Sequence, residues 1–199
     1  VPAWTIFGIF FIVVSTVNNI MKEKRDGSAF RLHTMPIKYS QLITGKLLVY
    51  VLICTIQFFT MMLVGVYFMP LIDLPALDLE DSYAGLIMLG VATSLTATSF
   101  GLLIGTIAQT EQQGAILGSL SVLLLSALGG IWVPAYVMPG VMRTISEFSP
   151  MNWAMEGFYS LLFRGDGLYS ALIPCIKLTV LALIFLITAT LYNRYKRRV

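Results

Sequence analysis

Long runs of apolar residues, separated by short polar segments, set the organisation of the chain. An α-helix needs about 20 mostly apolar residues to cross the hydrocarbon core of a bilayer. Five runs reach about that length or exceed it: residues 2–21, 43–69, 83–108, 115–133 and 168–192. The pattern therefore predicts an all-α, polytopic helical membrane protein with five spans in this chain.

Composition favours the same class. The chain is 57% hydrophobic and 12% charged, whereas soluble domains carry about 25% charged residues. Its two cysteines, Cys54 and Cys175, each lie within an apolar run, which is typical of small packing residues. Neither C-x-x-C nor zinc-ligand spacing occurs, so no metal site is predicted.

The placement of charge predicts the topology. The segment 22–46 holds six bases and two acids, the segment 70–82 holds four acids and no base, and the end of the chain is basic again. Because basic loops stay in the cytoplasm, we expect 22–46 and the C-terminus to be cytoplasmic in a multi-pass protein of the cell (inner) membrane. Counting spans then places Val1 outside. We therefore expect a fragment, with at least one further span upstream.

The basic segment 22–46 also has a local pattern. Gly27 permits a sharp turn, and Ser28 can cap a short helix over residues 29–35 that Pro36 ends. One interpretation is a clamp for anionic lipid, to which each base contributes about 1 kcal/mol of attraction. The other is a docking element for a cytoplasmic protein. Glu23 and Asp26 favour docking, because a lipid clamp has no use for acids.

The segment 134–167 is too apolar for a solvent loop and is interrupted by prolines. Ser149 and Pro150 have the pattern of a helix start, and Gly165 that of a helix end. A broken helical hairpin that re-enters the outer leaflet fits this pattern, since irregular backbone is tolerated where protein or a water-filled cavity surrounds it. An amphipathic interfacial helix fits equally well.

Two shorter patterns concern helix packing. Thr110 to Gln113 have capping-box spacing after a very short turn, which predicts that the third and fourth spans are antiparallel neighbours. Gly101 and Gly105 have the small-xxx-small spacing that lets helices approach closely.

Polar residues within the spans are candidates for a transport pathway. They carry amides and hydroxyls: Asn18, Asn19, Gln57, Thr93, Thr96 and Ser99. The alternative is that they bond to the i−4 carbonyl or join helices. Acids of the kind that relay protons are missing from the predicted spans, which argues against an ion-coupled secondary carrier.

Several of these segments together resemble the permeases of ABC type-2 transporters. "EKRDGS" at 23–28 resembles their E-[KR]-x-x-G-[TS] turn, and Met35-Pro36 and Gly45-Lys46 follow in the expected order. Downstream, "IGTIAQTEQQGAILG", "GGIWVPAYVMP" and "ISEFSPMNWAMEGFYSLLFRG" resemble the turn between the third and fourth spans and the outer re-entrant region. The resemblance covers nearly the whole chain, residues 1–199.

The resemblance implies a six-span subunit of the type V exporter fold, whose first span and any extracytoplasmic domain precede this chain. Two subunits, as a homo- or heterodimer, would form the pathway. The loop 22–46 with its coupling helix would dock on an ATPase subunit through Glu23, Lys24, Arg25, Gly27, Arg31 and His33. The outer region would act as a gate through Gly129, Gly130, Pro134, Pro139, Pro150 and Trp153.

We therefore expect a permease subunit of an ATP-driven exporter, not an enzyme. ATP and Mg²⁺ would bind the partner subunit, because Gly45-Lys46 is followed by Leu47 and does not form a phosphate-binding loop. No cofactor and no nucleic-acid partner is expected. The alternatives are a secondary carrier or channel and a non-transporting membrane scaffold. The residues do not specify the transported substrate.

Overall fold

The computed structural model describes residues 1–27, 39–73, 83–133, 137–162 and 168–196. Within these ranges the chain is helical and contains no strand. The helices are α1 (Pro2–Phe10), α2 (Ile12–Arg25), α4 (Tyr39–Leu63), α5 (Tyr83–Ile107), α6 (Glu111–Leu128), α7 (Gly140–Ser146), α8 (Pro150–Leu162) and α9 (Leu168–Lys196). A π-helical turn (Val64–Phe68) and a 3-10 turn (Pro70–Ile72) extend α4. The all-α prediction is thus confirmed for the described residues.

Four helical stretches are long and apolar enough to cross a membrane: Pro2–Arg25, Gln41–Phe68, Tyr83–Ile107 and Tyr169–Asn193. They coincide with four of the five predicted runs. The remaining run, 115–133, corresponds to α6, which has 18 residues and begins with the polar Glu111, Gln112 and Gln113. It ends at Leu128 rather than at residue 133, because the chain turns at Gly129 and Gly130, and Gly130 has a φ of +80°. A fifth span at α6 stays a prediction.

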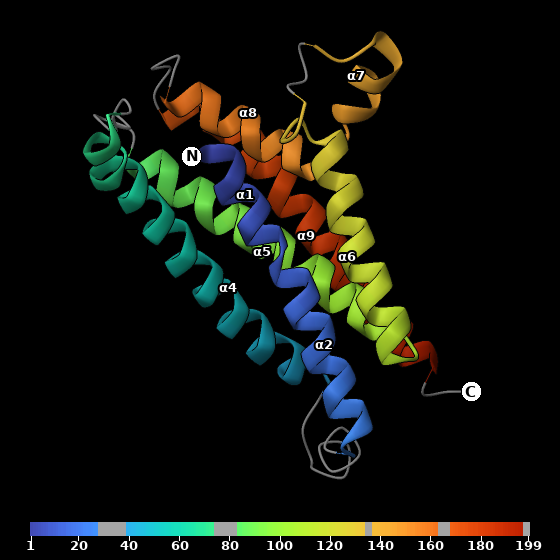
Figure 1. The fold of residues 1–199 in the computed structure, drawn as a ribbon. Coiled ribbons are helices and arrows are strands. Elements are labelled where there is room, and N and C mark those ends of the chain that lie inside the picture. Colours follow the sequence, from blue (N-terminus) through green and yellow to red (C-terminus); the bar gives the residue numbers. More distant parts are fainter. Residues whose placement is uncertain (28–38, 74–82, 134–136, 163–167, 197–199) are drawn as a thin grey trace.

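Helix α5 lies at the centre of the bundle (Figure 1) and contacts α1, α2, α4, α6, α8 and α9. Its hydroxyl-rich middle is buried almost all round, including Thr93, Thr96 and Ser99. The main hydrophobic core fills the space between α5 and its neighbours, with Phe10, Phe58, Leu89 and Phe158 fully buried. Cys54 and Cys175 are buried free thiols, as their positions in apolar runs predicted.

Helix α2 packs closely against glycines of two neighbouring helices. A Cβ at Gly101 of α5 would lie 3.1 Å from the Val13 Cα, and one at Gly114 of α6 would lie 2.8 Å from a Val17 methyl. The close approach predicted for Gly101 is confirmed, with α2 as the partner. Helix α6 contacts α5 through their short connection but packs more extensively on α2. The predicted neighbours α5 and α6 are therefore joined mainly through α2.

The basic segments share one end of the bundle. Figure 1 shows the end of α2, the start of α4, the α5–α6 turn and the end of α9 together at one end, with the N-terminus, α7 and α8 toward the opposite end. The sides of α4 and α9 that face away from the bundle carry exposed aliphatic residues: Leu48, Leu52, Ile56, Leu63, Ile176, Val180, Leu183 and Ile187. Such surfaces are those that lipid covers in a membrane protein.

Candidate functional site: the α2 charged cluster

Three consecutive residues at the end of α2 contact three different helices. Glu23 pairs with Lys46 of α4, Lys24 binds the end of α5, and Arg25 pairs with Glu111 of α6. Successive residues of an α-helix point about 100° apart, so adjacent side chains reach separate neighbours when a helix is surrounded. We name this group the α2 charged cluster: Glu23, Lys24, Arg25, Lys46 and Glu111.

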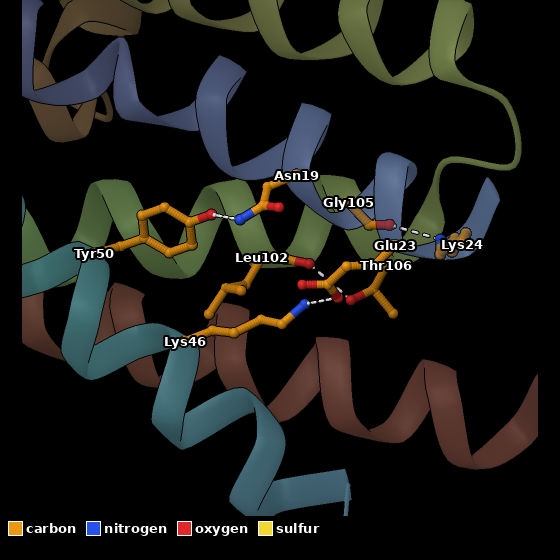
Figure 2. A network of polar contacts seen from close by, with 8 residues as sticks. All are labelled: Asn19, Glu23, Lys24, Lys46, Tyr50, Leu102, Gly105 and Thr106. Atoms are coloured by element: carbon orange, nitrogen blue, oxygen red, sulfur yellow. Dashed lines mark hydrogen bonds and ion pairs between the residues drawn. The ribbon is translucent and has the colours of Figure 1, made fainter. Parts of the chain in front are cut away.

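Lys24 caps α5 from a distant part of the sequence. Its Nζ donates to the carbonyl oxygen of Gly105 at 2.8 Å (Figure 2), and to that of Ala108 at 3.0 Å. The last carbonyls of a helix lack intrahelical partners and form the negative end of its dipole. An ammonium placed there satisfies both needs, and a hydrogen bond to a charged group contributes about 1.5–3 kcal/mol.

The ion pair between Glu23 and Lys46 ties α2 to α4 (Figure 2). Their side chains are only 27% and 17% exposed, so the pair is shielded from water more than a typical surface pair. One helical turn away on the same two helices, Asn19 Nδ2 donates to Tyr50 Oη at 2.6 Å. The two contacts form successive cross-links between α2 and α4.

Arg25 is held more loosely. Its guanidinium lies 3.0 Å from Glu111 and 3.3 Å from Asp26, with Arg25 61% and Glu111 51% exposed. Exposed pairs of this kind contribute about 0–1 kcal/mol. Arg25 and Asp26 therefore keep exposed surface, whereas Glu23 is partly buried and Lys24, although exposed, is bonded to the end of α5.

The turn that joins α5 to α6 is fixed by side-chain caps. Thr110 Oγ1 accepts from Gln113 N at 3.1 Å, which confirms the predicted cap. The return contact differs from a regular capping box, because Gln113 Oε1 accepts from Gln109 N, at 3.0 Å, instead of Thr110 N. Lys24 and Arg25 thus contact a well-defined turn.

Gly27 follows the cluster with a φ of +69°, a conformation that L side chains rarely adopt. The sharp turn predicted there is confirmed. Ser28, Arg31, His33 and the short helix predicted over 29–35 lie outside the described residues. Of the six predicted docking residues, the structure gathers Glu23, Lys24 and Arg25 at the end of α2 and places Gly27 in the turn that follows.

The predicted gate residues that the structure describes lie at the opposite end of the bundle from the α2 charged cluster. A Cβ at Gly129 would meet Met151 at 2.6 Å, which brings the end of α6 against the start of α8. Pro150 is the first residue of α8, as the predicted helix start requires. The hydroxyl of the preceding Ser149 donates to Leu125 O of α6, at 3.3 Å. Pro139 directly precedes α7, and Pro134 lies outside the described residues.

Trp153 is fixed on two sides. Its Nε1 donates to the Glu147 carbonyl at 2.6 Å, and Lys177 Nζ lies 5.8 Å from the ring centroid. Nearby in the sequence, Trp132 donates to the Ser126 hydroxyl and packs edge-on against Phe7. These contacts order the end of the bundle that carries α7 and α8, and both its outer side of the membrane and the re-entrant placement stay predictions.

The predicted pathway residues do not form one group. Asn18 and Asn19 are exposed on α2, while Gln57 packs against Gly8, where a Cβ would lie 2.7 Å from its amide nitrogen. On α5, Thr93 donates to Leu89 O, Ser99 to Leu95 O, and Thr96 to both Ala92 O and Leu178 O. These hydroxyls bond within the helix or join α5 to α9.

Sequence reasoning missed the partners of the cluster. Lys46 and Glu111 were noted only as part of a motif and a turn, and Tyr50 was not singled out. The sequence held a signal for the pairs Glu23–Lys46 and Arg25–Glu111, because in each pair an acid and a base stand near the ends of predicted spans. Among the described residues, no three His, Cys, Asp or Glu side chains are grouped so that they could hold a metal ion.

Comparison with known proteins places this chain in a family. The model of the "ABC-2 type transporter" family matches residues 1–163. The chain belongs to the ABC-2 type transporter family. It is 26% identical over 162 residues to the linearmycin resistance permease protein LnrN of Bacillus subtilis, covering 80% of this chain and 40% of that relative.

Further relatives are the inner membrane transport permeases YhhJ of Escherichia coli and of Shigella flexneri. Each is 30% identical over 159 residues, covering 78% of this chain and 40% of the relative. The chain thus spans less than half the length of these ABC-2 permeases. No solved structure matches it significantly. The resemblance inferred from the motifs is confirmed at the level of the family.

Proposed function

We propose that this ABC-2 family chain is the membrane-spanning part of a permease subunit that exports a substrate with energy from ATP hydrolysed by a partner subunit. The observation that carries the proposal is the α2 charged cluster. It connects the helix that leads into 22–46 with α4, α5 and α6. A force applied to the segment 22–46 therefore reaches three further helices directly.

The docking surface begins where the intramolecular contacts weaken. Glu23 and Lys24 are held by neighbouring helices, while Arg25 and Asp26 are exposed directly before the Gly27 turn. In this proposal Glu23 and Lys24 transmit motion into the bundle, and Arg25, with the following segment that includes Arg31 and His33, receives the ATPase. This end of the bundle, with the C-terminus, is the cytoplasmic one.

The other predicted elements complete the proposal. Helix α6 is a fifth span, a sixth precedes the chain, and α7 and α8 form an outer gate that re-enters the membrane. Asn18 is exposed on a helix made of span residues, a placement that suits a face turned toward a second subunit and the pathway, whereas Asn19 bonds to Tyr50 of α4. The candidate lining residues carry amides and hydroxyls without charge, which suits an apolar or amphipathic substrate.

A charge swap separates docking from packing. Arg25→Glu breaks the pair with Glu111, and the double variant Arg25→Glu with Glu111→Arg restores an ion pair inside the chain. We expect both to insert normally and both to lose co-purification of the ATPase subunit, because the partner contacts Arg25 itself. If the double variant recovers the ATPase, the pair with Glu111 is what matters, and Arg25 does not form the docking contact.

A further inference from the structure

We infer that Lys24 is a positioning residue that makes the end of α2 and the α5–α6 turn move as one unit during the transport cycle. The inference rests on the proposed function and deepens it, because it names the contact through which motion of the segment 22–46 reaches α5. The family match and the sequence motifs identify the bend but say nothing of this contact.

Lys24 differs from its two neighbours in the kind of acceptor that it binds. Glu23 and Arg25 bind side chains, which can follow them by changing rotamer. Lys24 binds the backbone carbonyls of Gly105 and Ala108, whose positions are those of the helix end itself. A displacement of α2 larger than the flexible Lys24 side chain can follow therefore either moves the end of α5 or breaks both hydrogen bonds.

The adjoining contact between α2 and α5 is tightly packed. One turn before Lys24, Ile20 packs on Gly105 so closely that a Cβ there would lie 2.6 Å from its Cδ1. At Gly105, Ile20 thus packs against the Cα, and Lys24 donates a hydrogen bond to the carbonyl oxygen. Because residues four apart lie on one face of a helix, the same face of α2 makes both contacts. The two contacts fix both the separation and the register of α2 and α5.

The α5–α6 turn that Lys24 contacts is internally hydrogen-bonded. The amides of Ala108, Gln109 and Gln113 are all hydrogen-bonded, to Ile104 O, Gln113 Oε1 and Thr110 Oγ1. A turn with bonded amides transmits a displacement instead of absorbing it. Helix α6 begins in the same turn, so a unit driven by Lys24 includes the start of α6.

The experiment measures amide hydrogen exchange in the full-length permease with its ATPase subunit, reconstituted in lipid nanodiscs, with and without trapping by ATP and vanadate. This readout needs no transported substrate. In the native protein we expect trapping to change exchange at both the α2 end and residues 108–113. In Lys24→Met the change at the α2 end persists and that at 108–113 is lost, while untrapped exchange at 108–113 rises by about tenfold.

Lys22→Met is the control, because Lys22 and Lys24 are both exposed on the same helix and Lys24 is the one that bonds to Gly105 and Ala108; this variant is expected to respond as the native protein does. Lys24→Arg keeps the charge and donors and is expected to retain part of the response, which also covers failure of Lys24→Met to fold. A native response at 108–113 in Lys24→Met, or equal loss in Lys22→Met, overturns the inference. If the native permease retains no ATPase, the proposed function fails, and untrapped exchange still tests the contact.

Discussion

Glu23 and Lys46 form an ion pair that joins α2 to α4 with both side chains more than two-thirds shielded from solvent. One turn away, Asn19 and Tyr50 repeat the connection through a hydrogen bond of 2.6 Å. The residues on α2 are four apart, as are those on α4, so both helices present one face to each other. This double contact holds the entry and exit of the segment 22–46 at a fixed separation.

Breaking the ion pair from one side should destabilise the bundle more than removing it from both. Loss of one partner leaves a partly buried charge, which in a fully buried pair costs about 3–5 kcal/mol. For this partly exposed pair we expect about 1–3 kcal/mol for Glu23→Gln or Lys46→Met, and less for the double variant than for the sum. Equilibrium unfolding in detergent measures all three. Strict additivity of the two single effects would contradict a direct pair.

Tyr50→Phe removes the hydroxyl that accepts from Asn19 and leaves the ring in place. Hydrogen bonds between membrane helices contribute about 0.6 kcal/mol on average and up to about 1.7 kcal/mol, so we expect a loss in that range. Tyr67→Phe serves as the control, because Tyr67 is 66% exposed at the far end of the same helix. The free energy of unfolding of both variants decides the point, and equal losses would argue against a contribution of the Asn19 contact.

Gly101→Ala should cost about 1–3 kcal/mol of unfolding free energy, since its new Cβ would press on the backbone of α2 at Val13. Gly45→Ala is the comparison, because nothing lies within 4 Å of a Cβ there. Alanine in a helix is favoured over glycine by about 0.5–1 kcal/mol, so Gly45→Ala should be neutral or stabilising. Similar effects at the two positions in thermal unfolding would contradict the close packing of α2 on α5.

Much of the fold follows from the sequence because its signals are local. Apolar runs predict the four long helices, the Thr110 cap and the Gly27 turn are set by a few neighbouring residues, and Gly101 predicts a close contact. The partner of that contact could not be predicted. Periodicity shows that a face is buried but not which helix covers it, so the packing of α6 on α2 was missed.

The candidate site shows the same division. The motif at 23–28 marked the right segment, since charges at a bend between two spans are unusual in so apolar a chain. It did not show that Glu23 and Lys24 are occupied by α4 and α5, because those contacts depend on how the helices pack. The hydroxyls of α5 were ambiguous for the opposite reason: a threonine that bonds its own helix and one that lines a pathway look identical in sequence.

The most direct test of the proposed role is crosslinking at the exposed end of α2. Asp26→Cys places an exposed thiol beside the turn after α2. Asp73→Cys places one beside the turn after α4, at the opposite end of the bundle. The native cysteines are buried. With a short bifunctional maleimide reagent in native membranes, we expect Asp26→Cys to capture an ATP-binding subunit and Asp73→Cys to capture none. Capture from Asp73→Cys instead, or labelling of Asp26→Cys by a membrane-impermeant maleimide added outside intact cells, would contradict the proposal that this end of α2 receives the ATPase.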